Sequence, residues 1–135
     1  MYHCIKQVIQ LEVNDLSFDH NVPIYLQLVE RIRFRIVSGD LEPGERVLSV
    51  REWALQEKVN PNTMQKALTS LEEEGLILTE RTNGKFVTSD PELIRACKKR
   101  EADRIAAEFL ERMSKIGFDR ENALKCLEQM KGENT

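Results

Sequence analysis

One stretch, residues 49–88, constrains the fold of this chain more than any other because it specifies two short helices and a hairpin. Ser49 and Glu52 have the spacing of a helix-capping box, in which each residue bonds the backbone of the other. This pattern predicts a helix that begins at Val50. A first, short helix before a compact second one restricts the chain to a few helical architectures.

The second helix is predicted from about Pro61 to Glu74. Asn60 is a favourable N-cap, proline suits the first helical position, and Gly75 suits the stop. Apolar residues recur at the spacing of one helical face. They are Met64, Ala67, Leu68 and Leu71. The opposite face is polar, so this helix is expected to cover a core with one side and expose the other.

Two short helices joined by a tight turn, with small polar residues opening the second, form the layout of a helix-turn-helix. Residues 77–80 then alternate weakly, Asn83-Gly84 is a strong hairpin turn, and residues 85–88 return. The hairpin is expected to form a wing. Residues 46–47 are predicted to add a short strand beside it, which would give a three-stranded sheet.

These motifs together resemble the amino-terminal domain of GntR-family transcriptional regulators. The matching segments are PIYLQLVERIRFRIVSGDLEPGERVLSVRE, VNPNTMQKALTSLEEEGLI and NGKFV, within about residues 22–88. The short remaining tail is similar to the YtrA-like subfamily, which lacks the large effector domain of other branches. The chain departs from the family pattern at four positions. Leu48 replaces a usual Pro, Glu57 an apolar residue, Lys58 a frequent Gly, and Thr82 a second wing Gly.

The resemblance implies a mainly α fold with a small β-wing (α+β), that is, a winged helix-turn-helix followed by a two-helix dimerisation segment. It implies a homodimeric, cytosolic regulator that binds palindromic double-stranded DNA, and it favours a repressor. In the family, the arginine that matches Arg51 touches DNA, which implies a guanine or phosphate contact here. The alternative for Arg51 is a surface ion pair with Glu52 or Glu57.

The start of the second helix has the chemistry to read bases. Free N–H groups at a helix N-terminus attract phosphate, Asn and Gln bond adenine, and a Thr methyl touches thymine. The residues expected to read or flank bases are Arg51, Asn60, Asn62, Thr63, Gln65 and Lys66. Those expected to hold the DNA backbone or minor groove are Ser49, Asn83, Gly84 and Lys85. The acidic run 72–74 is expected to be a solvated helix end that faces away from DNA.

Two segments precede this region. Residues 1–21 are interpreted as an N-terminal arm, either a partly ordered leader or a segment that packs on the dimer or on DNA. The winged helix-turn-helix is assigned to residues 22–89, and its first helix is predicted from Pro23 to about Ser38. Three arginines lie off the apolar stripe of that helix and are expected either to face solvent or to contact phosphate. They are Arg31, Arg33 and Arg35.

Residues 90–135 are predicted to form the helical dimerisation segment. Asp90 caps a long helix that Gly117 stops, and Asp119 caps a last helix. The polar segment 96–104 is expected to be a connector helix in water. The apolar positions expected at the dimer interface are Ile105, Phe109, Met113, Leu124 and Leu127. Two such helices from each of two copies would make a four-helix bundle, and the alternative is a monomer folded back on itself.

Composition narrows the classes of function. The chain has 135 residues and a formal net charge of −3, which favours local, shaped contacts with nucleic acid over general phosphate neutralisation. Three widely spaced cysteines indicate a reducing compartment, and no metal-binding or catalytic motif is present in the sequence. We therefore expect no enzyme activity and no cofactor. A winged-helix protein-interaction module without DNA binding is the rival function.

Overall fold

A computed structural model describes residues 18–130, so the predicted arm lies mostly outside the described residues. The described chain divides into two compact units, residues 18–101 and residues 102–130. The fold is helical with one small antiparallel sheet, as predicted. The first unit is the winged helix-turn-helix, and the second carries the carboxy-terminal helices.

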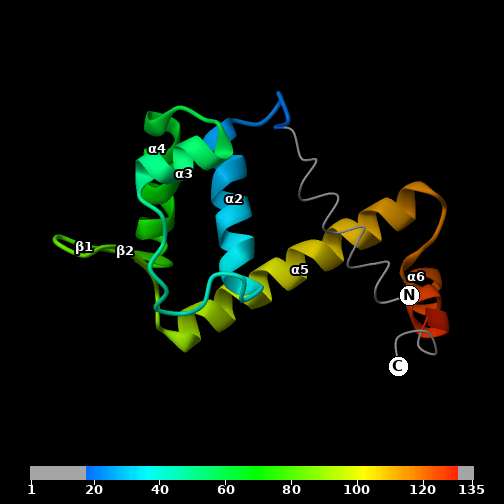
Figure 1. Ribbon diagram of the computed structural model, residues 1–135. Coiled ribbons are helices and arrows are strands. Elements are labelled where there is room, and N and C mark those ends of the chain that lie inside the picture. Colours follow the sequence, from blue (N-terminus) through cyan, green and yellow to red (C-terminus); the bar gives the residue numbers. More distant parts are fainter. Residues whose placement is uncertain (1–17, 131–135) are drawn as a thin grey trace. The chain divides into compact units, whose positions relative to one another are not determined.

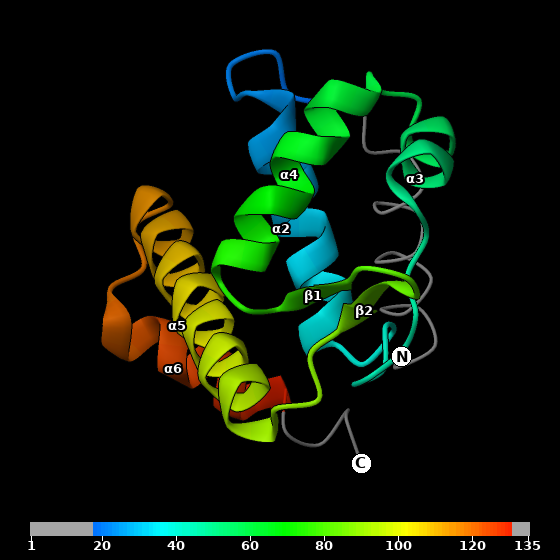
Figure 2. The ribbon, with the colours of Figure 1, turned by 90° about the vertical axis from the view of Figure 1, so that its left-hand side faces the viewer.

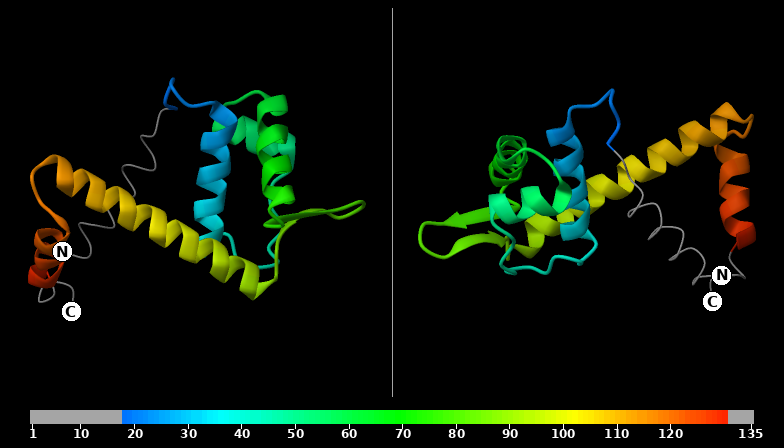
Figure 3. Two further views of the ribbon diagram at one scale, coloured as in Figure 1. Left: turned by 180° about the vertical axis from the view of Figure 1, so that it is seen from behind. Right: turned by 45° about the horizontal axis from the view of Figure 1, so that its top comes forward.

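The first unit is built on three helices and a hairpin (Figures 1 and 2). The helices are α2 (Ile24–Val37), α3 (Val50–Glu57) and α4 (Pro61–Glu73). The hairpin strands are β1 (Ile77–Glu80) and β2 (Gly84–Val87), which pair in antiparallel register. Figure 3 shows the hairpin projecting away from the three helices, as a wing does.

The core of this unit lies where α2, α3 and α4 meet. The apolar face predicted for α4 is completely buried, and Trp53 of α3 is 1% exposed among the same side chains. From α2 the core receives Leu28, Val29, Ile32, Ile36 and Val37. Trp53 is thus a packing anchor on the inner face of α3.

The start of α3 follows the capping pattern of the sequence. The Ser49 hydroxyl accepts a hydrogen bond from the Glu52 N–H, and a Glu52 carboxylate oxygen accepts one from the Ser49 N–H, which completes the capping box. Lys58 ends α3 in the left-handed region, with φ of +56°. This conformation explains why glycine suits the position, because a side chain there costs about 1–2 kcal/mol.

The predicted three-stranded sheet is wrong in detail. The sheet has two strands, and the segment before α3 contributes only an isolated bridge between Arg46 and Phe86. Backbone hydrogen bonds nevertheless attach this segment to β2, including Val47 N–H to the Lys85 carbonyl at 2.9 Å. The bridge is short because Pro43 and Gly44 turn the chain immediately before it and the capping box begins immediately after it.

Helix α5 (Pro91–Lys115) begins in the first unit, where the Asp90 carboxylate accepts hydrogen bonds from two first-turn N–H groups. Its first turns are not the connector in water that the sequence predicted. Cys97 is completely buried in the core, and Glu101 is buried as well. The prediction failed because this stretch is mostly charged, and a few apolar groups suffice to seat a helix.

The arginines of α2, which the sequence left either in solvent or on phosphate, take part in salt bridges within the chain. Each pairs with a carboxylate: Arg31 with Glu57, Arg33 with Glu74, and Arg35 with Asp40. Burial acts to lower the pKa of Arg33, but the hydrogen bond and charge of Glu74 outweigh it and the pKa is raised. The first two pairs join α2 to the ends of α3 and α4, and the third joins it to the loop that follows α2.

The second unit contains the rest of α5 and helix α6 (Arg120–Gln129). The Asp119 carboxylate caps α6 by accepting a hydrogen bond from the Asn122 N–H, as predicted. Gly117 stops α5 with φ of +90°. Large apolar side chains remain exposed along both helices. They are Ile105, Ile116, Leu124, Leu127 and Met130.

The burial of the α4 apolar face predicts that shortening two different leucines will change the free energy of unfolding by very different amounts. Leu68→Ala, at a completely buried position, is expected to lower the free energy of unfolding by about 2–5 kcal/mol. Leu55→Ala is the matched control, since Leu55 is 79% exposed and its loss should change stability by less than about 0.5 kcal/mol. Urea titration of both variants measures the difference, and similar losses would contradict this core.

Candidate nucleic-acid interface

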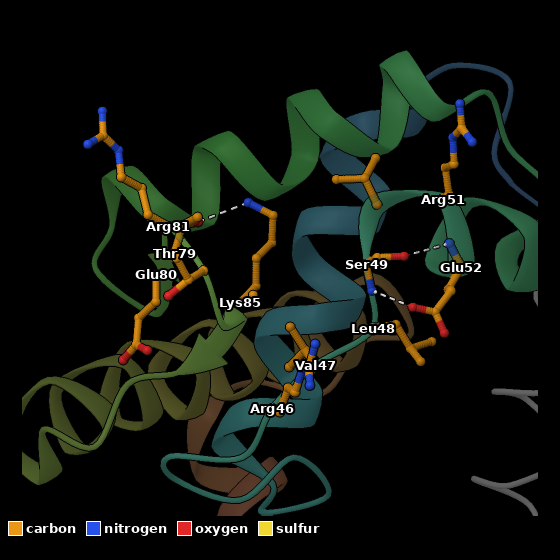
Figure 4. Close-up of a pocket in the computed structure, with 13 residues that line it drawn as sticks. Arg46, Val47, Leu48, Ser49, Arg51, Glu52, Thr79, Glu80, Arg81 and Lys85 are labelled. Carbon is orange, nitrogen blue, oxygen red and sulfur yellow. Dashed lines mark hydrogen bonds between the residues drawn. The ribbon is translucent and has the colours of Figure 1, made fainter.

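A groove of about 870 Å³ runs between the start of α3 and the wing (Figure 4). Its floor is the segment 46–48, and its sides are the first turn of α3 and the hairpin. Arg51 stands at the α3 end, and Arg81 stands at the hairpin turn. The polar and charged residues that line it are Arg46, Ser49, Arg51, Glu52, Thr79, Glu80, Arg81, Thr82 and Lys85.

Arg51 presents an available guanidinium to this groove. The side chain is exposed, and both carboxylates that might pair with it are engaged elsewhere. Glu52 is held in the capping box, which lowers its pKa through hydrogen bonds to Ser49, and Glu57 pairs with Arg31. Arg51 forms no salt bridge within residues 18–130, so the expected alternative of a surface ion pair is not realised there.

The amino-terminal turn of α4 opens toward solvent beside α2. The Asn60 side chain caps the helix by accepting the Asn62 N–H at 2.7 Å, so its amide N–H₂ is the part left to face a ligand. Asn62 is exposed and Thr63 half-buried. Both line a second hollow of about 430 Å³ with Ile24 and Tyr25 of α2.

Gln65 and Lys66, the next two polar residues of α4, each make one contact within the protein. Gln65 donates a hydrogen bond from Nε2 to the Thr69 hydroxyl at 3.2 Å, one turn further along the helix. The Lys66 ammonium lies 4.1 Å from the centre of the Tyr25 ring, a cation–π contact. Lys66 is therefore turned toward α2, on the flank of the exposed face.

Two of the three acidic residues at the end of α4, Glu72 and Glu74, are paired within the protein, whereas Glu73 is exposed as expected of a solvated helix end. Lys85 of the wing donates hydrogen bonds to the Glu72 carboxylate and to the Thr79 hydroxyl, and Glu74 pairs with Arg33. Burial acts to raise the pKa of Glu72, but the bonds and charge of Lys85 and the bond from Thr79 outweigh it, so the pKa is lowered. The sequence could not indicate this because the partners lie on other elements.

The wing turn is held by two further contacts. Asn83 donates from Nδ2 to the Glu80 carboxylate at 3.0 Å. Gly84 has φ of +101°, and its backbone lies directly under the Arg46 guanidinium. The structure thus brings four of the predicted residues to one groove: Ser49, Arg51, Gly84 and Lys85.

Comparison with known proteins identifies the architecture. The model for bacterial regulatory proteins of the gntR family matches residues 24–87. The transcriptional regulator YhcF of Bacillus subtilis is 35% identical over 111 residues, which cover 82% of this chain and 92% of that protein. The chain belongs to the GntR family. It is a transcriptional regulator with a GntR-type DNA-binding domain.

Two further relatives agree with this assignment. A GntR-family transcriptional regulator from Listeria monocytogenes is 38% identical, covers 83% of this chain and 98% of that chain, and superimposes with a TM-score of 0.75. The transcriptional repressor YtrA of Bacillus subtilis is 37% identical over 70 residues, 52% of this chain and 54% of that protein. The predicted likeness to the YtrA-like branch is confirmed.

Sequence reasoning missed two residues of the groove. Arg46 was considered only as part of a strand, and Arg81 was not considered. The sequence did contain a signal for both residues. Arg46 lies three positions before the helix-turn-helix stretch that begins at Ser49, and Arg81 adjoins the hairpin turn. Neither forms a salt bridge within residues 18–130. None of the helices described in the chain is long and apolar enough to cross a membrane.

The Glu72–Lys85 pair predicts a pH-dependent contribution to stability. Because the pKa of Glu72 is lowered on folding, its stabilising effect is present above its ordinary value of 4.5 and is lost as the pH falls through the folded value. Glu72→Gln should lower the free energy of unfolding by about 1 kcal/mol at pH 7, and the difference should narrow in acid.

Glu73→Gln is the matched control, because Glu73 is exposed and forms no salt bridge within the described part of the chain. Thermal unfolding between pH 3 and pH 7 measures both variants. Identical pH profiles for the two would exclude a specific role for Glu72.

Proposed function

We propose that this regulator is a repressor that binds a palindromic operator as a homodimer. The observation that carries the proposal is the groove beside α3, where Arg51 is exposed and forms no salt bridge within residues 18–130. The repressor assignment is supported by the similarity to YtrA of Bacillus subtilis, which is named a repressor. Binding to double-stranded DNA would place the protein in the cytoplasm.

In this proposal the first turn of α4 enters the major groove. Arg51 reads guanine through its fork of donors, while Asn62 and Thr63 face base edges from the helix start. Asn60, Gln65 and Lys66 lie beside them, each with one contact already made within the protein. The residues that the sequence assigned to the DNA backbone or minor groove are Ser49, Asn83, Gly84 and Lys85. Of these, Lys85 already has its ammonium engaged by Glu72 and Thr79.

Dimerisation is proposed for the helical segment in residues 90–135. The apolar stripe of α5 and the apolar face of α6 are exposed in the single chain, and such surface is unfavourable in water at about 25 cal/mol per Å². Ile105, Phe109 and Met113 line one shallow groove of about 440 Å³. A second copy that covers these faces would form a symmetric interface and fix the spacing of two half-sites.

The rival function is a winged-helix module that binds another protein and not DNA. The net charge of −3 favours it, whereas membership of a DNA-binding regulator family disfavours it. Selection from a random duplex library separates the two. Enrichment of a palindrome supports the operator proposal, and no enrichment at any salt concentration rejects it.

Arg51→Ala should weaken binding to the selected operator by about 1–3 kcal/mol, if the guanidinium makes a bidentate base contact. Discrimination at one base pair should relax, and circular dichroism should stay native. Arg95→Ala is the control, since Arg95 is an exposed arginine of α5 outside the groove. Operator affinity equal to wild type for Arg51→Ala would contradict base contact.

Phe109→Asp should give a monomer that loses operator binding while the winged helix stays folded, because a charge in an apolar interface is costly. Ala107→Asp is the control on another face of the same helix, where the charge should be tolerated. Light scattering on a sizing column and nuclear magnetic resonance give the readouts. A wild-type monomer at micromolar concentration, or a dimeric Phe109→Asp that binds, would reject this interface.

A further inference from the structure

The wing side of the groove carries three cationic side chains, Arg46, Arg81 and Lys85, and they are not equivalent. Lys85 is the basic residue nearest the hairpin turn on β2, which makes it the obvious contact for DNA phosphate. Its side chain, however, is only 14% exposed, and its ammonium bonds both Glu72 and Thr79. A phosphate would have to displace the Glu72 carboxylate to reach the Lys85 ammonium. Little net attraction between the lysine and the phosphate would therefore remain.

Arg46 is in the opposite situation. Its side chain is exposed and forms no salt bridge within residues 18–130. Its charge acts on Glu52, a carboxylate that is itself held in the capping box. Its guanidinium therefore keeps its full charge and its donors for an external anion. Figure 4 shows Arg46 on the floor of the groove that Ser49 and Arg51 border.

The backbone under Arg46 is fixed on both sides. Arg46 bridges Phe86 of β2, and the hydrogen bonds from Val47 N–H to the Lys85 carbonyl and from Val87 N–H to the Glu45 carbonyl are each 2.9 Å. The residue thus moves with the wing, although it lies outside the hairpin in sequence. A cation carried on such a braced segment is positioned before a ligand arrives.

Gly84 positions the side chain itself. A Cβ on Gly84 would lie 3.3 Å from Arg46 Nε and 3.4 Å from Nη2, so the guanidinium packs on the bare backbone of the glycine. The φ of +101° favours glycine there, and a side chain would also force the guanidinium to shift by a few tenths of an ångström. Arg81, by contrast, extends from the hairpin turn without a comparable support.

We propose that Arg46, seated on Gly84, is the residue through which the wing binds the phosphate backbone of DNA, and that Lys85 is a positioning residue that ties the wing to α4. This inference rests on the proposed function. It assigns Gly84 an indirect role, since the glycine allows the arginine to reach its place. The contact is independent of base sequence because phosphate carries no sequence information.

The test is a set of binding curves for the full-length protein on the selected operator and on a scrambled duplex, across a range of salt concentrations. One phosphate contact contributes roughly 0.9 to the slope of log K against log salt, which is about eightfold in affinity near 0.1 M salt. Arg46→Ala should bind both duplexes about eightfold more weakly near 0.1 M salt, and the magnitude of its slope of log K against log salt should be smaller by about one. Arg46→Lys keeps the charge and should retain most of the slope.

Two controls separate the roles of the other cations. Lys85→Met should lower thermal stability but leave the salt slope near that of wild type, because its charge is already neutralised by Glu72. Arg95→Ala removes an exposed arginine outside the groove and should change neither quantity. An unchanged slope for Arg46→Ala, or a slope lowered by Lys85→Met instead, would overturn the assignment.

A double-mutant cycle tests whether DNA binding by Arg46 depends on its packing against Gly84. Gly84→Ala should weaken binding in the wild-type background and have a much smaller effect on binding in the Arg46→Ala background. Equal effects of Gly84→Ala in the wild-type and Arg46→Ala backgrounds would mean that the glycine acts only through its backbone conformation. That result would reject a role for packing between Arg46 and Gly84. Failure of the proposed function looks different, since the wild-type protein would then not prefer its selected operator to the scrambled duplex.

Discussion

The winged helix depends on one buried seam, the contact of α4 with α2. The four apolar residues of α4 are completely buried, and Leu28, Ile32 and Ile36 of α2 meet them. Because apolar side chains fill the buried face of α4, its polar residues lie on the solvent-facing side or on the flanks of the helix. The same packing that stabilises the domain therefore presents the first turn of α4 and fixes the direction of Asn62 and Thr63.

Local sequence rules were sufficient for the elements of this unit. The capping box of Ser49 and Glu52 and the Asn60-Pro61 start of α4 each act within a few residues, and each formed as predicted. The hairpin also formed, but its loop is residues 81–83, and Gly84 already pairs with Glu80 in the sheet. The rules failed where distant elements meet. The segment 46–48 became a bridge instead of a strand, and the charged start of α5 proved to be seated in the core through Cys97.

The candidate site was less predictable than the fold because its electrostatics depend on pairs across elements. Arg51 and Lys85 look alike in the sequence as exposed cations near a helix-turn-helix. The structure separates them, since Glu72 engages Lys85, while Glu52 and Glu57 are engaged away from Arg51. A net charge of −3 is compatible with a DNA-binding role because, within residues 18–130, the three arginines that line the groove form no salt bridge.

The bond between Glu72 and Lys85 also has an evolutionary consequence. It joins one turn of a recognition helix to a wing that is thirteen positions further along the chain. Loss of the lysine would leave a half-buried carboxylate without its cation, and loss of the glutamate would release a positive charge into the groove. The two positions are therefore expected to change together during descent, so that relatives inherit either the acid and the base or neither.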